Sequence, residues 1–355
     1  MLPDGGNSRV AALCGAPVLA VCGFSGSGKT TLLEAALPQL VARGLSVAVV
    51  KHDAHGFNVD REGKDSDRLF RAGATIALRG PQEQFQRRGS AASLTLEATL
   101  ADFARDHDLL LVEGHKDTPL PKLWLAGKEE SAPPANVRNI ESILPWDTDR
   151  LSRFMAFVDR WLPTAWNARA LYLGFSMGEH RAKAQAPGGS RDAEARLKSL
   201  AELLPFPDID SPQVAILGST GRQIPPGTTR LPAPPDLDLC PEADSSNGAR
   251  RLIANLLAAH HWAPRAAWIV IASKHAELAK SATRWLSSLR RPGTWAAVPR
   301  SSNGQLSFSF ALYEPQALAL IDRLVLGANN HAALLEELSV HPRTVTPDLP
   351  EEFSI

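Results

Sequence analysis

The sequence predicts an α/β protein with two successive units, each a mostly parallel sheet with helices on its faces. Short apolar runs alternate with helical stretches along most of the 355 residues, which is the pattern of a parallel sheet. A glycine-rich turn joins the first apolar run to the first helical stretch, and the alternation starts again near residue 168. We therefore expect a flexible N-terminus over residues 1–16, one unit over residues 17–163 and a second over residues 168–350.

Composition narrows the class of protein. The 38 basic and 38 acidic residues cancel, so the net charge does not favour a nucleic acid or an anionic membrane as partner. No apolar run approaches the length of a membrane span, and the N-terminus lacks the pattern of a signal peptide, which predicts a cytoplasmic protein. Cys14, Cys22 and Cys240 are too few and too scattered for a disulfide framework or a four-ligand zinc site. We interpret Cys22 as a small buried strand residue.

The first unit is predicted element by element. The run "APVLAVC", residues 16–22, is typical of a buried strand, and "TTLLEAALPQLVARG", residues 30–44, of a helix that Gly44 ends. Further strands are predicted at "SVAVVK" and "DLLLVEG", residues 46–51 and 108–114. Residues 126–139 form a polar loop in this interpretation, and the apolar spacing of residues 143–162 predicts a closing helix.

The turn between the first strand and helix fits the phosphate-binding pattern GxxxxGK[ST] at every fixed position. Glycines let successive backbone N–H groups face phosphate oxygens, and the helix N-terminus adds partial positive charge. Lys29 would reach the β- and γ-phosphates. The alternative is an ordinary glycine-rich strand-to-helix turn. The predicted nucleotide contacts, which include two residues at the end of the next strand, are Gly23, Ser25, Gly26, Ser27, Gly28, Lys29, Thr30, Thr31, Lys51 and His52.

A Mg²⁺ site is predicted beside this turn. The Thr30 hydroxyl belongs to the motif, and Asp53 and Glu113 each follow the carboxyl end of a predicted strand, the edge of a parallel sheet where ligands bind. Mg²⁺ takes one or two carboxylates and keeps several waters. The alternative interpretation is a pair of solvated carboxylates at strand ends.

Other charged groups near this edge leave more than one interpretation open. His52 and His55 flank Asp53, but two histidines without a third ligand are more typical of hydrogen-bonding loop residues than of a zinc site. The charged side chains in residues 64–71 could contact a nucleotide or a partner, or could form a solvated helix face. The charged side chains that we considered there are Lys64, Asp65, Arg68 and Arg71.

Three stretches of the first unit resemble one family. The runs "GFSGSGKTTLLEAALPQLVARGLSVAVVKHDAHGF", "GKDSDRLFRAGA" and "DLLLVEGHKDTPLPKLWL" look like the molybdopterin-guanine dinucleotide biosynthesis protein B family over nearly all of residues 17–162. The resemblance implies a P-loop GTPase-type fold, usually dimeric, that binds GTP, hydrolyses it slowly and assists guanylylation of the molybdenum cofactor. The choice of guanine rests on the resemblance alone, because the chain has no N-K-x-D motif.

The second unit is predicted to contain strands at "ALYLGFSMGE", "QVAILGS", "AAWIVIAS" and "TWAAVPR", with the proline-rich residues 221–244 as a surface loop. The segments "SSNGARRLIANLLAAHHWAPRAAWIVIAS" and "FSFALYEPQALALIDRLVLGANNHAALLEEL" are similar to parts of the molybdenum cofactor guanylyltransferases, and the similarity spans roughly residues 168–350. That similarity implies a nucleotidyltransferase-like, Rossmann-type α/β fold.

The catalytic parts of that second family are missing here. The segment "LYLGFSMGEHRAKA" lacks the family's glycine pair and the arginine before Met177. Ser273, Lys274 and His275 replace a Cys-Asp-x-Pro segment whose aspartate holds Mg²⁺, and Thr346 stands where an asparagine is expected. Replacing a metal carboxylate with an ammonium disfavours a divalent cation, which predicts a catalytically inactive domain. Asp244 is either a retained ligand or a loop-capping aspartate.

The sequence thus predicts a GTP-binding adapter for molybdenum cofactor guanine dinucleotide synthesis, with weak GTPase activity and an inactive guanylyltransferase-like domain for scaffolding or docking. The expected ligands are GTP, Mg²⁺ and, on the second unit, molybdopterin or the molybdenum cofactor. The expected partners are a molybdenum cofactor guanylyltransferase, a cofactor-receiving apoenzyme and a second copy of the chain. The alternatives are an active bifunctional guanylyltransferase, a P-loop kinase, or an interaction protein that uses no nucleotide.

Overall fold

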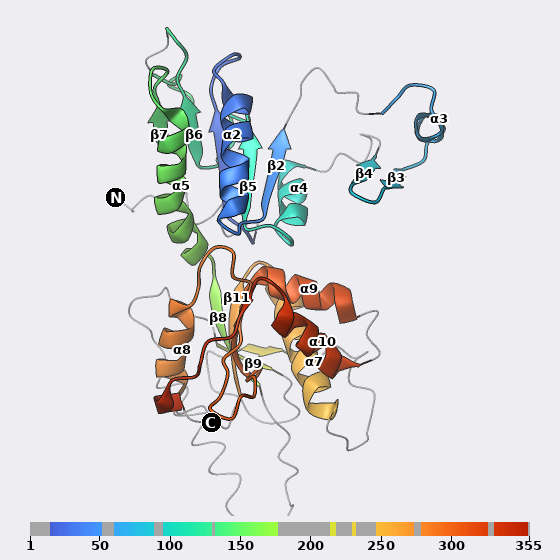
Figure 1. Cartoon of the computed structure of the whole chain (residues 1–355), viewed down its shortest axis with the longest axis vertical. Coiled ribbons are helices and arrows are strands. Elements are labelled where there is room, and N and C mark those ends of the chain that lie inside the picture. The colour runs from blue at the N-terminus through green and yellow to red at the C-terminus, as the bar shows by residue number, and fades with distance from the viewer. Residues whose placement is uncertain are drawn as a thin grey trace, which may run out of the picture.

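Two sheets, one after the other along the chain, organise the protein (Figure 1). The structure is a computed structural model. It describes residues 15–51, 60–88, 95–129, 132–176, 214–217, 229–231, 246–272, 278–325 and 330–353. No helix among these residues is both long and apolar enough to cross a membrane.

The first sheet is parallel throughout and has the strand order β2-β5-β1-β6-β7. The parallel α/β class predicted for this part of the chain is therefore confirmed. Strand β6 and the edge strand β7 were not predicted, because β6 has only four residues and β7 alternates half-buried with exposed positions until its buried last residue. The strands are β1 (Val18–Cys22), β2 (Val47–Lys51), β5 (Leu109–Glu113), β6 (Lys122–Leu125) and β7 (Ile140–Leu144).

Helices cover both faces of this sheet because alternate residues of its central strands point to opposite sides. Leu19 and Val21 of β1 pack with α2 (Lys29–Ala42) and α5 (Arg150–Asn167). Val18 and Ala20 face the other side, where α4 (Leu96–Phe103) contributes Leu100 to the core. Strands buried on both faces read as continuous apolar runs, as the first strand does.

The closing helix differs from the prediction at both ends. Residues 143 and 144 belong to β7, and α5 begins only at Arg150, where the Asp149 side chain caps it by accepting from the Ser152 N–H at 3.1 Å. An aspartate at this position satisfies a free N–H of the first turn, so the capping signal outweighed the apolar periodicity. The helix also continues through Pro163 to Asn167.

A small segment stands to the side of the first sheet (Figure 1). It consists of α3 and an antiparallel hairpin, and Arg87 joins them by ion pairs to Asp60 at 3.3 Å and Asp67 at 3.0 Å. The Gly63 N–H hydrogen bond and the two arginines lower the pKa of Asp67 to about 2. Of the charged residues 64–71, Arg68 pairs with Asp65 at 3.9 Å, and Arg71 pairs with Glu62 and Asp67, all within this segment. Its elements are α3 (Asp65–Arg71), β3 (Ile76–Arg79) and β4 (Gln84–Arg87).

The second sheet has the strand order β10-β9-β8-β11-β13-β12-β14, in which only β13 runs against its neighbours. The prediction of a surface loop over residues 221–244 is wrong in part, because Thr229–Leu231 forms β10 and Leu231 is buried. The strands are β8 (Leu171–Ser176), β9 (Val214–Leu217), β10, β11 (Ala267–Ala272), β12 (Ala296–Ala297), β13 (Phe310–Tyr313) and β14 (Thr344–Val345).

Helices also cover both faces of the second sheet. On one face, α7, α9 and α10 share an apolar core with Trp268 and Tyr313. On the opposite face, α8 and the short helix η4 pack against the sheet. The helices are α7 (Ser246–Trp262), α8 (Ala279–Ser288), α9 (Pro315–Val325), α10 (His331–Val340) and η4 (Glu351–Phe353).

The two sheets meet through their amino edges. Asp108, just before β5, is fully buried and accepts from Trp295 Nε1 at 2.7 Å and from the Arg343 guanidinium, two residues that precede strands of the second sheet. Arg169, just before β8, donates to the Gly15 carbonyl and forms an ion pair with Glu314 at 2.7 Å. The carboxyl edges of both sheets therefore face away from the junction, toward opposite ends of the molecule (Figure 1).

Candidate nucleotide-binding site

The turn after β1, residues 23–30, is shaped by three glycines with positive φ. Gly23 has a φ of 150°, and a Cβ there would lie 2.5 Å from both the Leu125 carbonyl oxygen and Ser27 Oγ. Gly26 and Gly28 also have positive φ values, of 75° and 85°. These conformations leave the loop open toward solvent at the N-terminus of α2, the geometry that backbone N–H groups need to face an anion. We call residues 23–30 the phosphate turn.

Lys29 lies folded over this turn. Its ammonium donates to the Gly23 carbonyl at 3.0 Å and to the Phe24 carbonyl at 2.8 Å. Both acceptors are neutral carbonyls, and the ammonium is paired with no carboxylate among the described residues. A phosphate oxygen would offer it a charged acceptor, and hydrogen bonds between charged groups are the stronger ones.

A hydroxyl and a carboxylate meet beside the phosphate turn, as predicted for a metal site. Thr30 Oγ1 donates to Glu113 Oε1 at 2.9 Å, and the Lys51 ammonium lies 3.5 Å from the same oxygen. The Glu113 side chain is 11% exposed, so a ligand on the turn can reach it. Hydroxyl and carboxylate oxygens suit Mg²⁺, and the pair fits a site completed by nucleotide oxygens and water. His52 and Asp53, which we also predicted here, lie outside the described residues.

The other predicted contacts divide into exposed and buried positions. Ser25, Gly26 and Thr31 are exposed, whereas Ser27 is 2% exposed and its hydroxyl has no hydrogen-bond partner among the described residues. No cluster of three or more metal-ligating side chains of the His, Cys, Asp and Glu types exists in the part of the chain that the structure describes.

Arg150 holds the phosphate turn from behind, and sequence reasoning missed it. Its guanidinium donates to the Ser27 carbonyl at 2.7 Å, to the Pro145 carbonyl at 2.9 Å and to the Ala126 carbonyl. One side chain thereby ties together the loops after β1, β6 and β7. The rigid fork of an arginine suits this role. Its only sequence signal is a basic residue directly after the Asp149 cap.

Two buried polar side chains support the turn after β5. Cys22 donates to the Gly114 carbonyl at 3.0 Å, and burial raises the pKa of its thiol to about 11. The fully buried Lys122 donates to the carbonyls of Thr118 and Leu120, and burial lowers its pKa. These bonds fix the turn that starts at Glu113. The prediction that Cys22 is a buried strand residue is confirmed.

At the carboxyl edge of the second sheet, the ends of β8 and β11 lie side by side. These strands lead into two of the segments that we compared with the guanylyltransferases. β8 and β11 are parallel neighbours, and Ser176 pairs with Ala272 at their ends. Asn255 of α7 is fully buried and donates to Ser176 Oγ at 2.9 Å. Thr346, just past β14, accepts from Arg300 at 3.4 Å. Met177, Asp244, Ser273, Lys274 and His275 lie outside the described residues.

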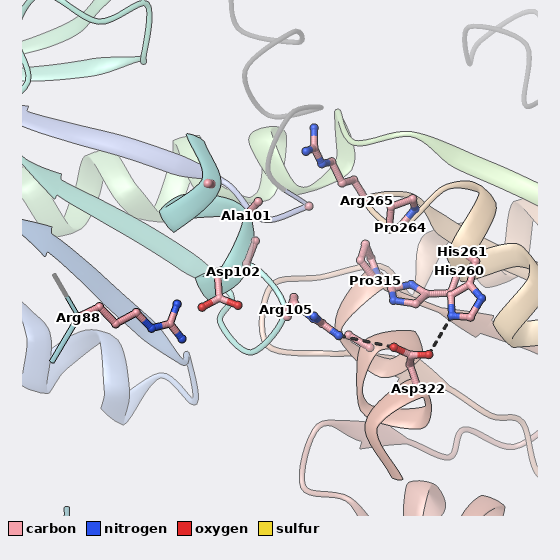
Figure 2. A pocket seen from close by; sticks show the side chains of 14 residues that line it. Arg88, Ala101, Asp102, Arg105, His260, His261, Pro264, Arg265, Pro315 and Asp322 are labelled. Carbon is pink, nitrogen blue, oxygen red and sulfur yellow. Dashed lines mark hydrogen bonds and ion pairs between the residues drawn. The ribbon is translucent and has the colours of Figure 1, made fainter. Parts of the chain in front are cut away.

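A pocket of about 680 Å³ opens between the two units (Figure 2). Three arginines from separate elements, Arg88, Arg105 and Arg265, line it, and Asp322 pairs with Arg105 at 3.6 Å and with His261 at 2.9 Å. The floor is apolar and consists mainly of alanines and prolines. A buried histidine, His260, also lines the pocket, and burial lowers its pKa to about 4.

Comparison with known proteins finds relatives of the first unit. Residues 18–145 match the family model "Molybdopterin guanine dinucleotide synthesis protein B". The molybdopterin-guanine dinucleotide biosynthesis adapter protein of Haemophilus influenzae is 35% identical over 159 residues, which are 41% of this chain and 89% of that protein. Its Escherichia coli counterpart is 37% identical over 114 residues, 31% of this chain and 65% of that protein. A crystal structure of molybdopterin-guanine biosynthesis protein B matches at 25% identity and a TM-score of 0.34, covering 41% of this chain and 98% of the other.

Proposed function

The chain belongs to the molybdopterin guanine dinucleotide synthesis protein B family, and we propose that it is an adapter whose first unit binds GTP and Mg²⁺. One observation carries this proposal. The phosphate turn, Lys29, and the Thr30–Glu113 pair lie together at the carboxyl edge of a parallel sheet. In such sheets this edge is where ligands bind.

Each group has a distinct role in this proposal. Backbone N–H groups of the phosphate turn surround the phosphates, and Lys29 moves from the Gly23 and Phe24 carbonyls to phosphate oxygens. Thr30 and Glu113 would hold Mg²⁺, with Asp53 as the second acid, and the ion would supply positive charge that neutralises the phosphates.

We propose that hydrolysis is slow. Fast phosphoryl transfer to water needs a residue that orients the water and a group that stabilises the transition-state charge. At the carboxyl edge of the described residues, Glu113 is engaged by Thr30 and Lys51, and no glutamine takes the orienting position. The bound state would therefore last long enough to serve as a signal for a partner.

The second unit is, in this proposal, an inactive relative of the molybdenum cofactor guanylyltransferases. Its support is that the segments compared with the family's nucleotide loop, metal aspartate and late asparagine follow β8, β11 and β14, whose carboxyl ends share one edge. β8 also lies where the chain order reverses, with β9 on one side and β11 on the other, the usual place for a ligand. The departures from the family pattern thus fall on one edge.

The pocket between the units is our candidate site for the pterin. The pterin part of a guanine dinucleotide carries a phosphate. Three arginines line this pocket and could bind that anion. Its volume lies within the ~300–1,000 Å³ usual for small-molecule sites, which are common at domain interfaces. Arg265→Ala should weaken molybdopterin retention and leave GTP binding unchanged. Unchanged retention would contradict this assignment.

The proposed partners are the guanylyltransferase, the apoenzyme that receives the cofactor and a second copy of the chain. The hairpin of β3 and β4 supports self-association, because a two-stranded sheet is at best marginally stable alone and both of its outer edges are unpaired among the described residues. Sedimentation of the wild type and of a Leu78→Lys variant, which places a charge at an exposed apolar position of β3, tests this.

The experiment for the nucleotide proposal combines calorimetry and phosphate release. Wild type should bind Mg-GTP more tightly than Mg-ATP, Lys29→Ala should lose most of the affinity, and turnover should stay far below the ~1 to 100 per second of kinases. Glu113→Gln should weaken the dependence on Mg²⁺. Fast turnover or a preference for ATP would contradict the adapter role and favour a P-loop kinase. Formation of the dinucleotide from GTP and molybdopterin by the purified chain would favour an active guanylyltransferase.

A further inference from the structure

The position of the proposed metal ligands indicates which way a bound nucleotide would run. Glu113 ends β5, the neighbour of β1, and Thr30 of α2 donates to it, so the γ-phosphate end of a nucleotide held by this pair would lie on the β5 side of the phosphate turn. The phosphates extend along the N-terminus of α2. In that orientation the base would lie on the opposite side of β1, over the loops that follow β6 and β7, because these strands lie on the side of β1 away from β5.

The loop after β7, residues 145–149, is held rigidly at this place. Arg150 donates to the Pro145 carbonyl at 2.9 Å and to the Ser27 carbonyl of the phosphate turn at 2.7 Å. The Thr148 hydroxyl donates to the Pro145 carbonyl at 3.0 Å, and Asp149 caps α5. The backbone of this loop and the phosphate turn are therefore positioned by the same guanidinium.

Two side chains project from this fixed loop with surface available for a ligand. Trp146 is 44% exposed, and the Arg150 guanidinium lies 5.0 Å from the centre of its ring. Asp147 is exposed, and its carboxylate makes no hydrogen bond or ion pair within the described residues. An exposed aromatic ring beside a free carboxylate combines a stacking surface with a hydrogen-bond acceptor.

We propose that Trp146 stacks with the nucleotide base and that Asp147 selects guanine. Guanine presents two donors, N1–H and the 2-amino group, on one edge, and an ionised carboxylate offers two acceptor oxygens to them. Adenine presents an acceptor at N1, which the carboxylate repels. The inference rests on the proposed GTP site and supplies the base-reading element that the N-K-x-D motif would otherwise provide.

The test measures equilibrium binding of Mg²⁺ complexes of GTP, ATP, inosine triphosphate and xanthosine triphosphate to the full chain. For the wild type, GTP should bind best, and inosine triphosphate, which lacks the 2-amino group, should bind severalfold more weakly. Asp147→Asn should lose about 10- to 100-fold in GTP affinity. It should gain affinity for xanthosine triphosphate, because the asparagine amide can donate to the carbonyl oxygen that replaces the 2-amino group.

Two further variants separate the roles. Asp149→Asn makes the same charge change two residues away and keeps the helix cap, because asparagine caps as well as aspartate, so its GTP preference should match the wild type. Trp146→Ala should weaken all four nucleotides about tenfold without changing their order. Circular dichroism checks that each variant is folded.

The two proposals fail in different ways. A wild type that prefers GTP, with the same preference in Asp147→Asn as in Asp149→Asn, would overturn the role of Asp147 and leave the GTP site standing. A wild type that binds no nucleotide would overturn both.

Discussion

Two charged clusters lie at opposite edges of the first sheet, and they are built in opposite ways. At the amino edge, Asp108, Arg169 and Glu314 are almost completely buried, and each is bonded to partners of opposite charge. At the carboxyl edge, Lys29 is only partly buried, and its ammonium donates to two neutral carbonyls.

This contrast separates structural charges from binding charges. A buried ion needs an opposite charge or a set of hydrogen bonds, because an unsatisfied charge in the interior costs several kcal/mol. An accessible ammonium that donates only to carbonyls can exchange those bonds for bonds to a ligand. We therefore assign the amino edge to joining the two units and the carboxyl edge to binding a nucleotide.

The largest effect is expected at the amino edge, for Glu314→Gln. This change leaves Arg169 and Arg290, which lie 2.7 Å and 2.8 Å from the Glu314 carboxylate, buried without a counter-ion. Removing one member of a buried ion pair costs about 3–5 kcal/mol of unfolding free energy. Urea unfolding followed by tryptophan fluorescence measures it.

Asp159→Ala is the matched control for this prediction. It breaks the exposed pair with Arg43, which should cost about 1 kcal/mol or less. Equal losses of unfolding free energy in the two variants would show that the buried ion pairs at the amino edge contribute no more to stability than an exposed pair.

A smaller effect is expected from pH, through His260. Burial lowers its pKa from 6.5 to about 4 in the folded protein, so the unfolded chain binds more protons between these values. The contribution of His260 to the unfolding free energy should therefore be fully present above pH 6.5. It should be lost as the pH is lowered toward 4, by a total of about 3 kcal/mol. The difference between the unfolding free energies of wild type and His260→Gln across this pH range measures this contribution. Parallel pH profiles of the two proteins would contradict it.

The smallest effect on stability is expected for Arg150. This residue lies at the carboxyl edge, which we assign to binding, but its role is structural. Arg150→Lys keeps the charge but loses the fork that holds Ser27 and Pro145. We expect about 1–2 kcal/mol of lost stability and a severalfold loss of GTP affinity. The exposed Arg153→Lys should change neither quantity. A variant that loses stability but binds GTP normally would show that the clamp does not shape the phosphate turn.

Sequence reasoning was most successful where the chemistry is local. The phosphate turn follows from glycines and Lys29 at fixed spacing, and Thr30 and Glu113 meet because parallel strands bring their carboxyl ends together. Strand β7 was missed because the apolar residues at its end, Ile143 and Leu144, continue the apolar spacing of the following helix, so the sequence predicts one helix across both.

The long-range contacts could not be predicted in this way. Asp108 and Trp295 are separated by 187 residues, and neither belongs to a motif. Arg150 carries no signal beyond its place after a cap, because its role depends on three loops that meet only in the folded sheet. Such contacts are a property of topology rather than of spacing.

The most direct test of the account is the unfolding free energy of the full chain with and without Mg-GTP. A ligand at one hundred times its dissociation constant stabilises the native state by about 2.7 kcal/mol. We predict this gain for the wild type and for Asp159→Ala, and its loss for Lys29→Ala. Equal stabilisation of wild type and Lys29→Ala, or none in either, would contradict the assignment of the carboxyl edge to nucleotide binding.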